Sequence, residues 1–136
     1  MSQSGILLFC NMSPVIWYNK KKNYVQTSTF GSDFTALKKG IRLTQAIKYK
    51  LQMFGVPLDV TTNIYCDNEV MYNNDNILES VLSKNHHLVL YHACGEAVDS
   101  GMVIIAKENT LTNLADLFTK VLPIAFRERL LYMFIY

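Results

Sequence analysis

The sequence predicts a single α/β domain that spans residues 1–136. Short runs of β-favouring apolar residues alternate with stretches in which apolar residues recur every three or four positions, in the order β, β, α, β, α, β, α, α. Half of the 136 residues are hydrophobic, which suffices for one core, and the length leaves no room for a second domain. The sequence contains no internal repeat, low-complexity segment or linker.

Two short strands come first. Ile6–Phe9 and Val15–Tyr18 are apolar and β-favouring, and residues 11–14 between them predict a hairpin turn. Tyr24–Thr27 predicts a third strand. The connection before it carries a run of lysines at its expected tip: Lys20, Lys21 and Lys22. Such a run is usually a solvated surface and marks a nucleic-acid patch only in the right context, so both interpretations stay open.

The longest helical pattern runs from Ser32 to Phe54. Residues three or four positions apart predict one buried stripe along it. The stripe consists of Phe34, Leu37, Ile41, Thr44, Ile47, Leu51 and Phe54. Gly55 and Pro57 follow, and they predict the end of the helix.

The middle of the chain predicts a strand and a second long helix. Ile64–Cys66 is the strand, and a short helix at Asn68–Tyr72 and an asparagine-rich turn at Asn73–Asn76 are expected after it. A helix is then predicted from His86 to Val98, ended by the turn at residues 99–101. Its expected inner side consists of His87, Tyr91, Cys94 and Val98.

Three further elements complete the chain. Met102–Ala106 is a continuous apolar run, which is typical of a buried strand. Asn113 is expected to open a helix. Its inward-facing residues are Leu114, Leu117, Phe118 and Val121. Pro123 then breaks the chain, and Ile124–Phe134 predicts a last amphipathic helix.

Three aspartates lie at the mouths of separate predicted elements: Asp33, Asp67 and Asp116. Asp67 follows a strand directly, and the carboxyl ends of strands in an α/β sheet face the ligand crevice. Asp33 and Asp116 each open a helix, so we expect the three carboxylates to meet in one pocket that can hold a metal or a phosphate. Structural alternatives stay open for two of them. A first-turn acid such as Asp33 complements the helix dipole, and Asp116 has capping-box spacing from Asn113.

The cysteines and histidines show no paired spacing. Cys10, Cys66 and Cys94 are odd in number, which indicates a reducing compartment rather than a disulfide scaffold. Tetrahedral zinc sites usually show separated couples of ligands, and the neighbouring residues His86, His87, His92 and Cys94 do not have that spacing. We therefore do not predict zinc.

Charge and hydropathy indicate where the protein is located more clearly than they indicate what it binds. The formal net charge of +2 neither demands nor excludes nucleic acid. The N-terminal residues lack the basic region of a signal peptide, and the apolar tail Leu130–Tyr136 is far shorter than the roughly 20 residues of a membrane helix. We expect a soluble intracellular protein without a membrane partner.

Four segments together resemble the ribonuclease H domain of copia-type retrotransposon polyproteins. They are Thr29–Leu37, Ile64–Asn68, Tyr91-His92 and Asn113–Pro123, and their order and spacing match across nearly the whole chain. Cys66-Asp67-Asn68 is weak alone, but combined with Ala115–Lys120 it is specific. The resemblance implies a ribonuclease H-like mixed sheet flanked by helices.

The resemblance also implies an activity, which is hydrolysis of the RNA strand of an RNA–DNA hybrid. In that family two Mg²⁺ ions, or Mn²⁺, activate the attacking water and stabilise the leaving oxygen. By the family pattern Asp67 bridges the two metal ions, Asp33 stands where the family carries glutamate, and Asp116 supplies the last metal-site acid. The implied partners are the hybrid and the reverse transcriptase domain of the parent polyprotein.

The resemblance further implies a surface that binds nucleic acid. Its residues are Lys20, Lys21, Lys22, Asn68 and His92. Basic side chains there neutralise backbone phosphates, and 2′-hydroxyl groups distinguish RNA from DNA.

The chain departs from the family pattern in three respects. The family's first strand, central in the sheet and carrying its leading aspartate, is expected just before Ser4-Gly5 and is missing, which leaves two neighbouring strands with unpaired backbone groups. Asp33 is one methylene shorter than glutamate. Expected basic positions are replaced by Leu90, Ala93 and Gly95. We expect an N-terminally truncated, eroded copy that is weak or inactive as an enzyme. The alternative is a non-catalytic remnant or a repurposed nucleic-acid-binding module.

Overall fold

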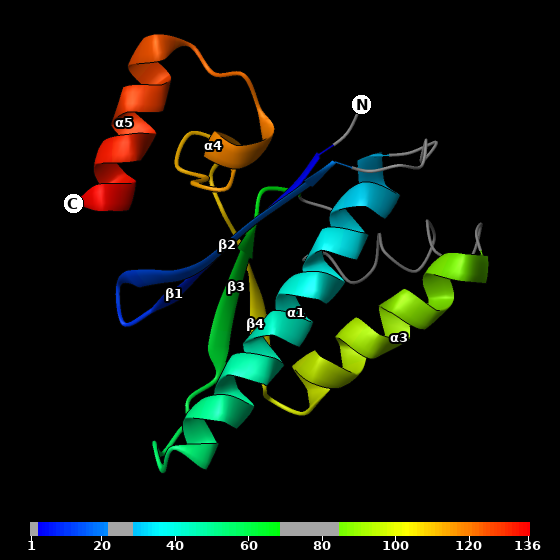
Figure 1. Ribbon diagram of the computed structural model, residues 1–136. Helices are drawn as coiled ribbons and strands as arrows, with labels where there is room; N and C mark the ends of the chain where they lie inside the picture. Colours follow the sequence, from blue (N-terminus) through cyan, green and yellow to red (C-terminus); the bar gives the residue numbers. More distant parts are fainter. Residues whose placement is uncertain (1–2, 22–28, 69–84) are drawn as a thin grey trace.

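The computed structural model describes residues 3–21, 29–68 and 85–136. Within these ranges four strands form two two-stranded sheets, and four helices pack around them (Figure 1). This mixed α/β architecture confirms the predicted class. Three predicted features lie outside the described residues, namely the strand at Tyr24–Thr27, Lys22, and the short helix and turn over residues 69–76.

The first sheet is an antiparallel hairpin of β1 (Gln3–Cys10) and β2 (Ser13–Lys21). Asn11 and Met12 connect the strands, with φ of 48° and 68°. Two positive φ angles are the signature of a turn whose twist matches that of the flanking strands. The predicted four-residue turn is therefore wrong in length, because Pro14 already belongs to β2. A register shift between Leu8 and Phe9 accommodates that proline.

The lysine run begins within a strand. Lys20 and Lys21 are exposed residues at the end of β2, paired in register with Ser4 and Gln3. The prediction that they form a loop tip is therefore wrong. The strand continues through them because side chains on the solvent face of a two-stranded hairpin remain in water without leaving the ladder.

Helix α1 (Thr29–Met53) supplies much of the core. Phe34, Leu37, Ile41 and Thr44 are buried, as the predicted stripe requires. Phe54 is 84% exposed, which contradicts the last member of that stripe. The helix ends one residue earlier and the chain turns at Gly55 (φ 79°), so Phe54 leaves the helical face.

The second sheet pairs β3 (Thr62–Cys66) with β4 (Val103–Lys107) in parallel. The predicted strands are confirmed, but the expectation that the second is buried throughout is wrong. Val103 is fully buried whereas its neighbour Ile104 is half exposed. Only one side of this sheet is covered at that point, so successive side chains alternate between core and solvent.

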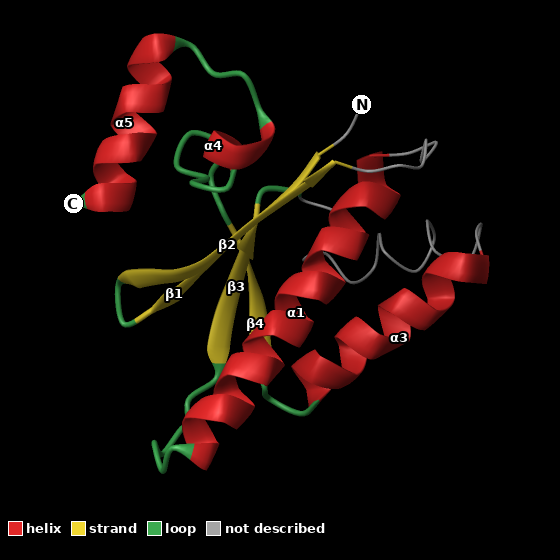
Figure 2. Cartoon of the chain, in the orientation of Figure 1, coloured by secondary structure: helices red, strands yellow, loops and turns green. Residues whose placement is uncertain are grey.

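Helix α3 (Asn85–Asp99) lies beside α1, and both cover β3 and β4 (Figure 2). Its inner face consists of Tyr91, Cys94 and Ala97, while Val98 is exposed, contrary to the prediction. The helix ends at the predicted turn, where Gly101 adopts a φ of 71°.

The C-terminal region contains two helices, α4 (Asp116–Thr119) and α5 (Ile124–Ile135). The predicted helix after Asn113 is a single short turn, and Val121 is fully exposed rather than inward-facing. In α5, Leu130 is fully buried and the ring of Phe134 packs edge-on against Phe9 and Phe118. No helix in the described ranges is long and apolar enough to cross a membrane.

Helix α1 spans the division between the two sheets. It contacts both β1 and β3, and the Lys39 ammonium lies 3.7 Å from the centre of the Tyr18 ring on β2. Among the described strands, β1 pairs only with β2 and β3 only with β4. No ladder within the described residues therefore joins the hairpin to the strand that leads to Asp67.

Candidate carboxylate site

Three separate elements carry the predicted aspartates toward one end of the molecule. The N-terminal half of α1 carries Asp33, the carboxyl end of β3 leads into Asp67, and α4 begins with Asp116 (Figure 1). Asp33 is the fifth residue of α1, so the interpretation that it complements the dipole from the first turn is wrong.

Asp116 is the most enclosed of the three, with only 4% of its surface exposed. Its Oδ2 accepts a 2.8 Å hydrogen bond from the Lys120 ammonium, and its Oδ1 accepts a 3.4 Å bond from the Asn113 side-chain amide. Asn113 Oδ1 in turn accepts from the Ala115 N–H. The predicted capping relationship is wrong, because the N-cap of α4 is Ala115 and no side chain caps the helix. Asn113 instead holds both the turn and the carboxylate.

The Lys120 ammonium also faces Asp67. Its Nζ lies 3.8 Å from Asp67 Oδ2, and the lysine side chain is 49% exposed. The hydrogen bond that Lys120 donates to Asp116 raises the pKa of Lys120, and the charges of Asp116, Asp67 and Asp33 raise it further against the opposing effect of burial. Two of the predicted aspartates, Asp67 and Asp116, therefore contact a single cation.

Asp33 is tied to the end of β3 through a neighbour of Asp67. The Asn68 side-chain amide donates a 2.8 Å hydrogen bond to Asp33 Oδ2. Burial, followed by the charge of Asp67, raises the pKa of the adjacent Cys66 thiol to about 11. The thiol is therefore protonated at neutral pH, which excludes Cys66 as a nucleophile there.

The oxygen atoms of these side chains are suitable ligands for Mg²⁺, but the side chains are not arranged closely enough to bind it. Carboxylate and amide oxygens are ligands that Mg²⁺ prefers. As they stand, no three His, Cys, Asp or Glu side chains in the described ranges are grouped closely enough to hold a metal ion. The space between Asp67 and Asp116 is held by Lys120 instead.

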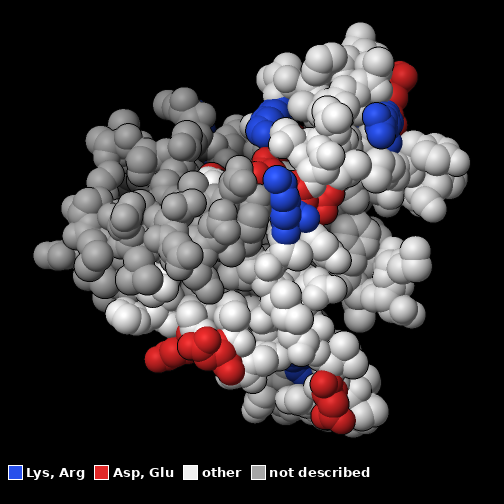
Figure 3. All heavy atoms as spheres, turned by 180° about the vertical axis from the view of Figure 1, so that it is seen from behind, with Lys and Arg blue, Asp and Glu red and all other residues white. Residues whose placement is uncertain are grey.

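A cavity of about 590 Å³ adjoins Asp67, and neither Asp33 nor Asp116 is in its lining. Its lining consists of Asp67, Lys107, Glu108, Asn109 and Thr110. On the face drawn in Figure 3, acidic and basic side chains lie next to each other in the upper half, whereas an acidic group at the lower left stands apart. The lining of the cavity is itself of mixed charge, because Lys107 accompanies Asp67 and Glu108.

The hairpin places two of the predicted nucleic-acid residues near this site. The Asn19 side-chain amide donates a 2.5 Å hydrogen bond to the Phe118 carbonyl in α4, and Lys20 and Lys21 follow directly in β2. Asn68 lies among the aspartates. His92 lies on α3, exposed, with its ring edge-on to Tyr91.

Sequence reasoning missed Lys120 and Asn19. A signal for Lys120 was present, because Asp116 and Lys120 are four positions apart, the spacing at which opposite charges meet on a helix. No local signal points to Asn19, whose partner Phe118 lies 99 residues away in the chain. Such a contact depends on tertiary packing alone.

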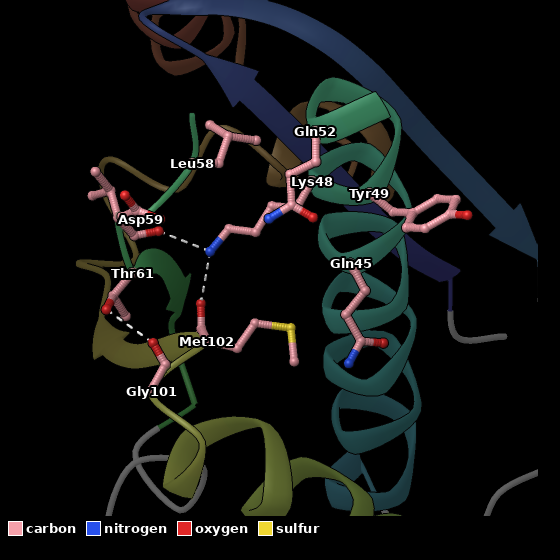
Figure 4. Close-up of a pocket in the computed structure, with 10 residues that line it drawn as sticks. Gln45, Lys48, Tyr49, Gln52, Leu58, Asp59, Thr61, Gly101 and Met102 are labelled. Atoms are coloured by element: carbon pink, nitrogen blue, oxygen red, sulfur yellow. Dashed lines mark hydrogen bonds between the residues drawn. The ribbon is translucent and has the colours of Figure 1, made fainter. Parts of the chain in front are cut away.

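A second, smaller cavity of about 300 Å³ lies at the opposite end of the second sheet (Figure 4). Lys48 of α1 points into it and donates hydrogen bonds to the carbonyls of Val60 (2.8 Å) and Met102 (3.1 Å). Thr61 Oγ1 donates to the Gly101 carbonyl at 2.9 Å. These bonds fasten the segments that enter β3 and β4 to the helix, which is a structural role.

No family model and no solved structure matches this chain.

Proposed function

We propose that this chain is a ribonuclease H-type domain of a retrotransposon polyprotein that binds RNA–DNA hybrids and slowly hydrolyses the RNA strand. The observation that carries the proposal is that Lys120 contacts both Asp67 and Asp116, while Asn68, the neighbour of Asp67, donates a hydrogen bond to Asp33. The motifs around these aspartates are the ones that resemble the family.

The division of the sheet supports the same proposal. The family's first strand is expected between the hairpin and the strand ending at Asp67, and among the described strands no pairing joins these two. The mixed α/β elements also occur in the expected order.

The proposed roles follow from the positions of the side chains. Asp67 projects from the end of a strand beside a cavity, and Asp116 lies at the start of α4 with both oxygens engaged. Asp33, Asp67 and Asp116 would hold Mg²⁺ or Mn²⁺ only after drawing closer together, and the ion would then supply an activated water and stabilise the leaving oxygen. Lys20 and Lys21 neutralise hybrid phosphates from the adjacent strand.

One observation favours a second candidate, a non-catalytic hybrid-binding module. Lys120 already neutralises Asp116 and lies close to Asp67, and no three acidic, His or Cys side chains of the described part are grouped to hold a metal ion. A module of this kind keeps the basic strand end of β2 but performs no hydrolysis.

A cleavage assay separates the two candidates. The chain is incubated with an RNA–DNA hybrid labelled in the RNA strand and with Mg²⁺ or Mn²⁺, beside matched RNA–RNA and DNA–DNA duplexes. The proposal expects slow cleavage of the hybrid alone, lost in Asp67→Asn and retained in Asp59→Asn, an exposed aspartate outside the cluster. Cleavage that persists in Asp67→Asn comes from a contaminant and refutes the enzyme.

Binding is measured in the same samples by fluorescence anisotropy at several salt concentrations. Replacing both Lys20 and Lys21 by alanine is expected to flatten the slope of log K against log salt by roughly 1–2, since each phosphate contact contributes about 0.7–0.9. Binding without cleavage identifies the module. Absence of both binding and cleavage refutes the proposed function altogether.

A further inference from the structure

The single tryptophan of the chain lies exposed on the hairpin. Trp17 belongs to β2, and 63% of its surface is in contact with solvent. The burial of β2 alternates along this stretch, because Ile16 and Tyr18 are half-buried while Val15 and Trp17 are exposed. Tyr18 packs against Lys39 of α1, so Val15 and Trp17 face the other side of the hairpin. Two adjacent apolar side chains in water form a small contiguous patch there.

A lysine lies on the same side of the same strand. Successive side chains of a strand point to opposite sides, so Trp17, Asn19 and Lys21 share one side and Lys20 points to the other. Lys21 comes four positions after Trp17, which is about 13 Å along a strand. The Asn19 side-chain amide donates a hydrogen bond to the Phe118 carbonyl, so this part of the strand is held against α4. A flat ring and a cation are therefore presented by one fixed element.

The charges of the hairpin are of one sign. Residues 3–21 contain two lysines and no Asp or Glu. Helix α5, which packs against β1 through the rings of Phe134 and Phe9, adds two exposed arginines and one exposed glutamate. A partner that complements this surface needs negative charge together with flat apolar faces, and a nucleic-acid strand offers both in its phosphates and bases. Base faces are free for stacking where the strand is unpaired.

We propose that this side of the hairpin binds single-stranded nucleic acid, with one unpaired base stacked on the Trp17 ring and a phosphate neutralised by Lys21. The inference rests on the proposed function, because it deepens the nucleic-acid-binding part of it, but it requires neither the aspartates nor a metal ion. Since every base has a flat face, binding at Trp17 is tolerant of sequence. The strand that it holds is a free single strand or the unpaired extension of a hybrid.

The first test uses the unchanged protein and the emission of its single tryptophan, in the presence of a metal chelator. A single strand of about 12 nucleotides is expected to quench the emission in a saturable way, because a base stacks on the indole. A hybrid with an unpaired extension is expected to do the same. A blunt hybrid and a single strand of equal length without bases are expected to leave the emission unchanged. Absence of quenching by the single strand, or equal quenching by the strand without bases, overturns the inference.

The second test measures affinity for the single strand by fluorescence anisotropy. Trp17→Leu keeps an apolar side chain but removes the ring, and it is expected to weaken binding about fivefold or more. Tyr49→Leu is the matched control, because Tyr49 is equally exposed, at 64%, but lies on α1. Lys21→Ala is expected to weaken binding more than Lys20→Ala does, since only Lys21 shares the side of Trp17.

The outcomes separate this inference from the catalytic proposal. Trp17→Leu that binds the single strand as tightly as the unchanged protein, or no more weakly than Tyr49→Leu, overturns the inference even where the hybrid is cleaved. Binding that depends on Trp17, without cleavage of any hybrid, supports the inference and refutes the catalytic role.

Discussion

At the scale of single residues, burial and hydrogen-bond partners set the protonation states of a few ionisable groups. Asp116 is buried and has a partner for each oxygen, Asn113 and Lys120. Two thiols, Cys66 and Cys94, are also enclosed, and burial is the main cause that raises the pKa of each from 9.0 to about 11. Because of these thiols, the free energy of unfolding is expected to depend on pH in the alkaline range.

Stability is expected to decrease as the pH rises above 9. The native state holds protons on Cys66 and Cys94 up to about pH 11, whereas the unfolded chain releases them near pH 9, so the native state binds more protons between these values. The raised pKa of Lys120 acts in the same direction, because its contribution is complete below its unfolded pKa and is lost above its folded one. Each thiol contributes a loss on the order of 1 kcal/mol after allowance for screening by solvent.

Urea unfolding at pH 8, 9, 10 and 11 under reducing conditions measures this dependence. The double variant Cys66→Ala, Cys94→Ala is expected to lose most of the slope between pH 9 and 11. An equally steep slope in that variant contradicts the assignment to the thiols.

At the scale of elements, Gly5 and Asn19 of the hairpin determine the position of α4. A Cβ atom at Gly5 would lie 2.6 Å from Thr119 Cγ2 and 2.9 Å from the Ala115 carbonyl oxygen, so β1 and α4 approach each other closely only because residue 5 has no side chain. Asn19, which is opposite Gly5 in the ladder, adds a hydrogen bond to the same helix.

Gly5→Ala is expected to destabilise the protein by about 1–3 kcal/mol, because the backbone carbonyl of Ala115 cannot move aside without displacing α4. Gly40→Ala is the matched control. A Cβ at Gly40 in α1 meets nothing within 4 Å, so alanine there stabilises the helix by about 0.5–1 kcal/mol. Urea unfolding of both variants checks the prediction, and equal effects of the same sign would count against the close contact.

Features of the elements that depend on neighbouring residues could be predicted from the sequence, whereas those that depend on distant residues could not. The stripe Phe34, Leu37 and Ile41 and the end of α1 near Gly55 follow from local periodicity and turn chemistry, and both were predicted. The helix expected after Asn113 is shorter than predicted. It forms a single turn at Asp116–Thr119, and Val121 lies in solvent. In β4, Ile104 is exposed because the covering of that face depends on elements distant in sequence.

At the scale of the whole molecule, two small sheets share one helix. Isolated two-stranded sheets are marginal, so α1, which contacts both β1 and β3, joins the two sheets that the described strands form. Asp67 could be nominated from sequence because it directly follows a strand, and Lys120 could have been nominated from its spacing of four residues from Asp116. The approach of Lys120 to Asp67 could not, since it depends on the packing of elements that are distant in the chain.

Fusing a strand of about six residues with a central aspartate ahead of Gln3 is expected to raise the melting temperature. Such a strand can pair with the free side of β1 and with β3 in the described sheets, which satisfies backbone groups on both. Circular dichroism melting compares it with a fusion of equal length rich in glycine and serine. An identical melting temperature for the two fusions argues against a vacant central position.

The tight turn at Asn11–Met12 has a remote consequence for the chemistry. Gly5 and Asn19 hold α4 only in the present alignment of the hairpin. A slip of two residues preserves which side chains face inward but slides one strand by about 7 Å along the other. Lengthening or shortening that turn is therefore expected to shift α4 and to change the distance between Asp67 and Asp116, although neither residue is near the turn in sequence.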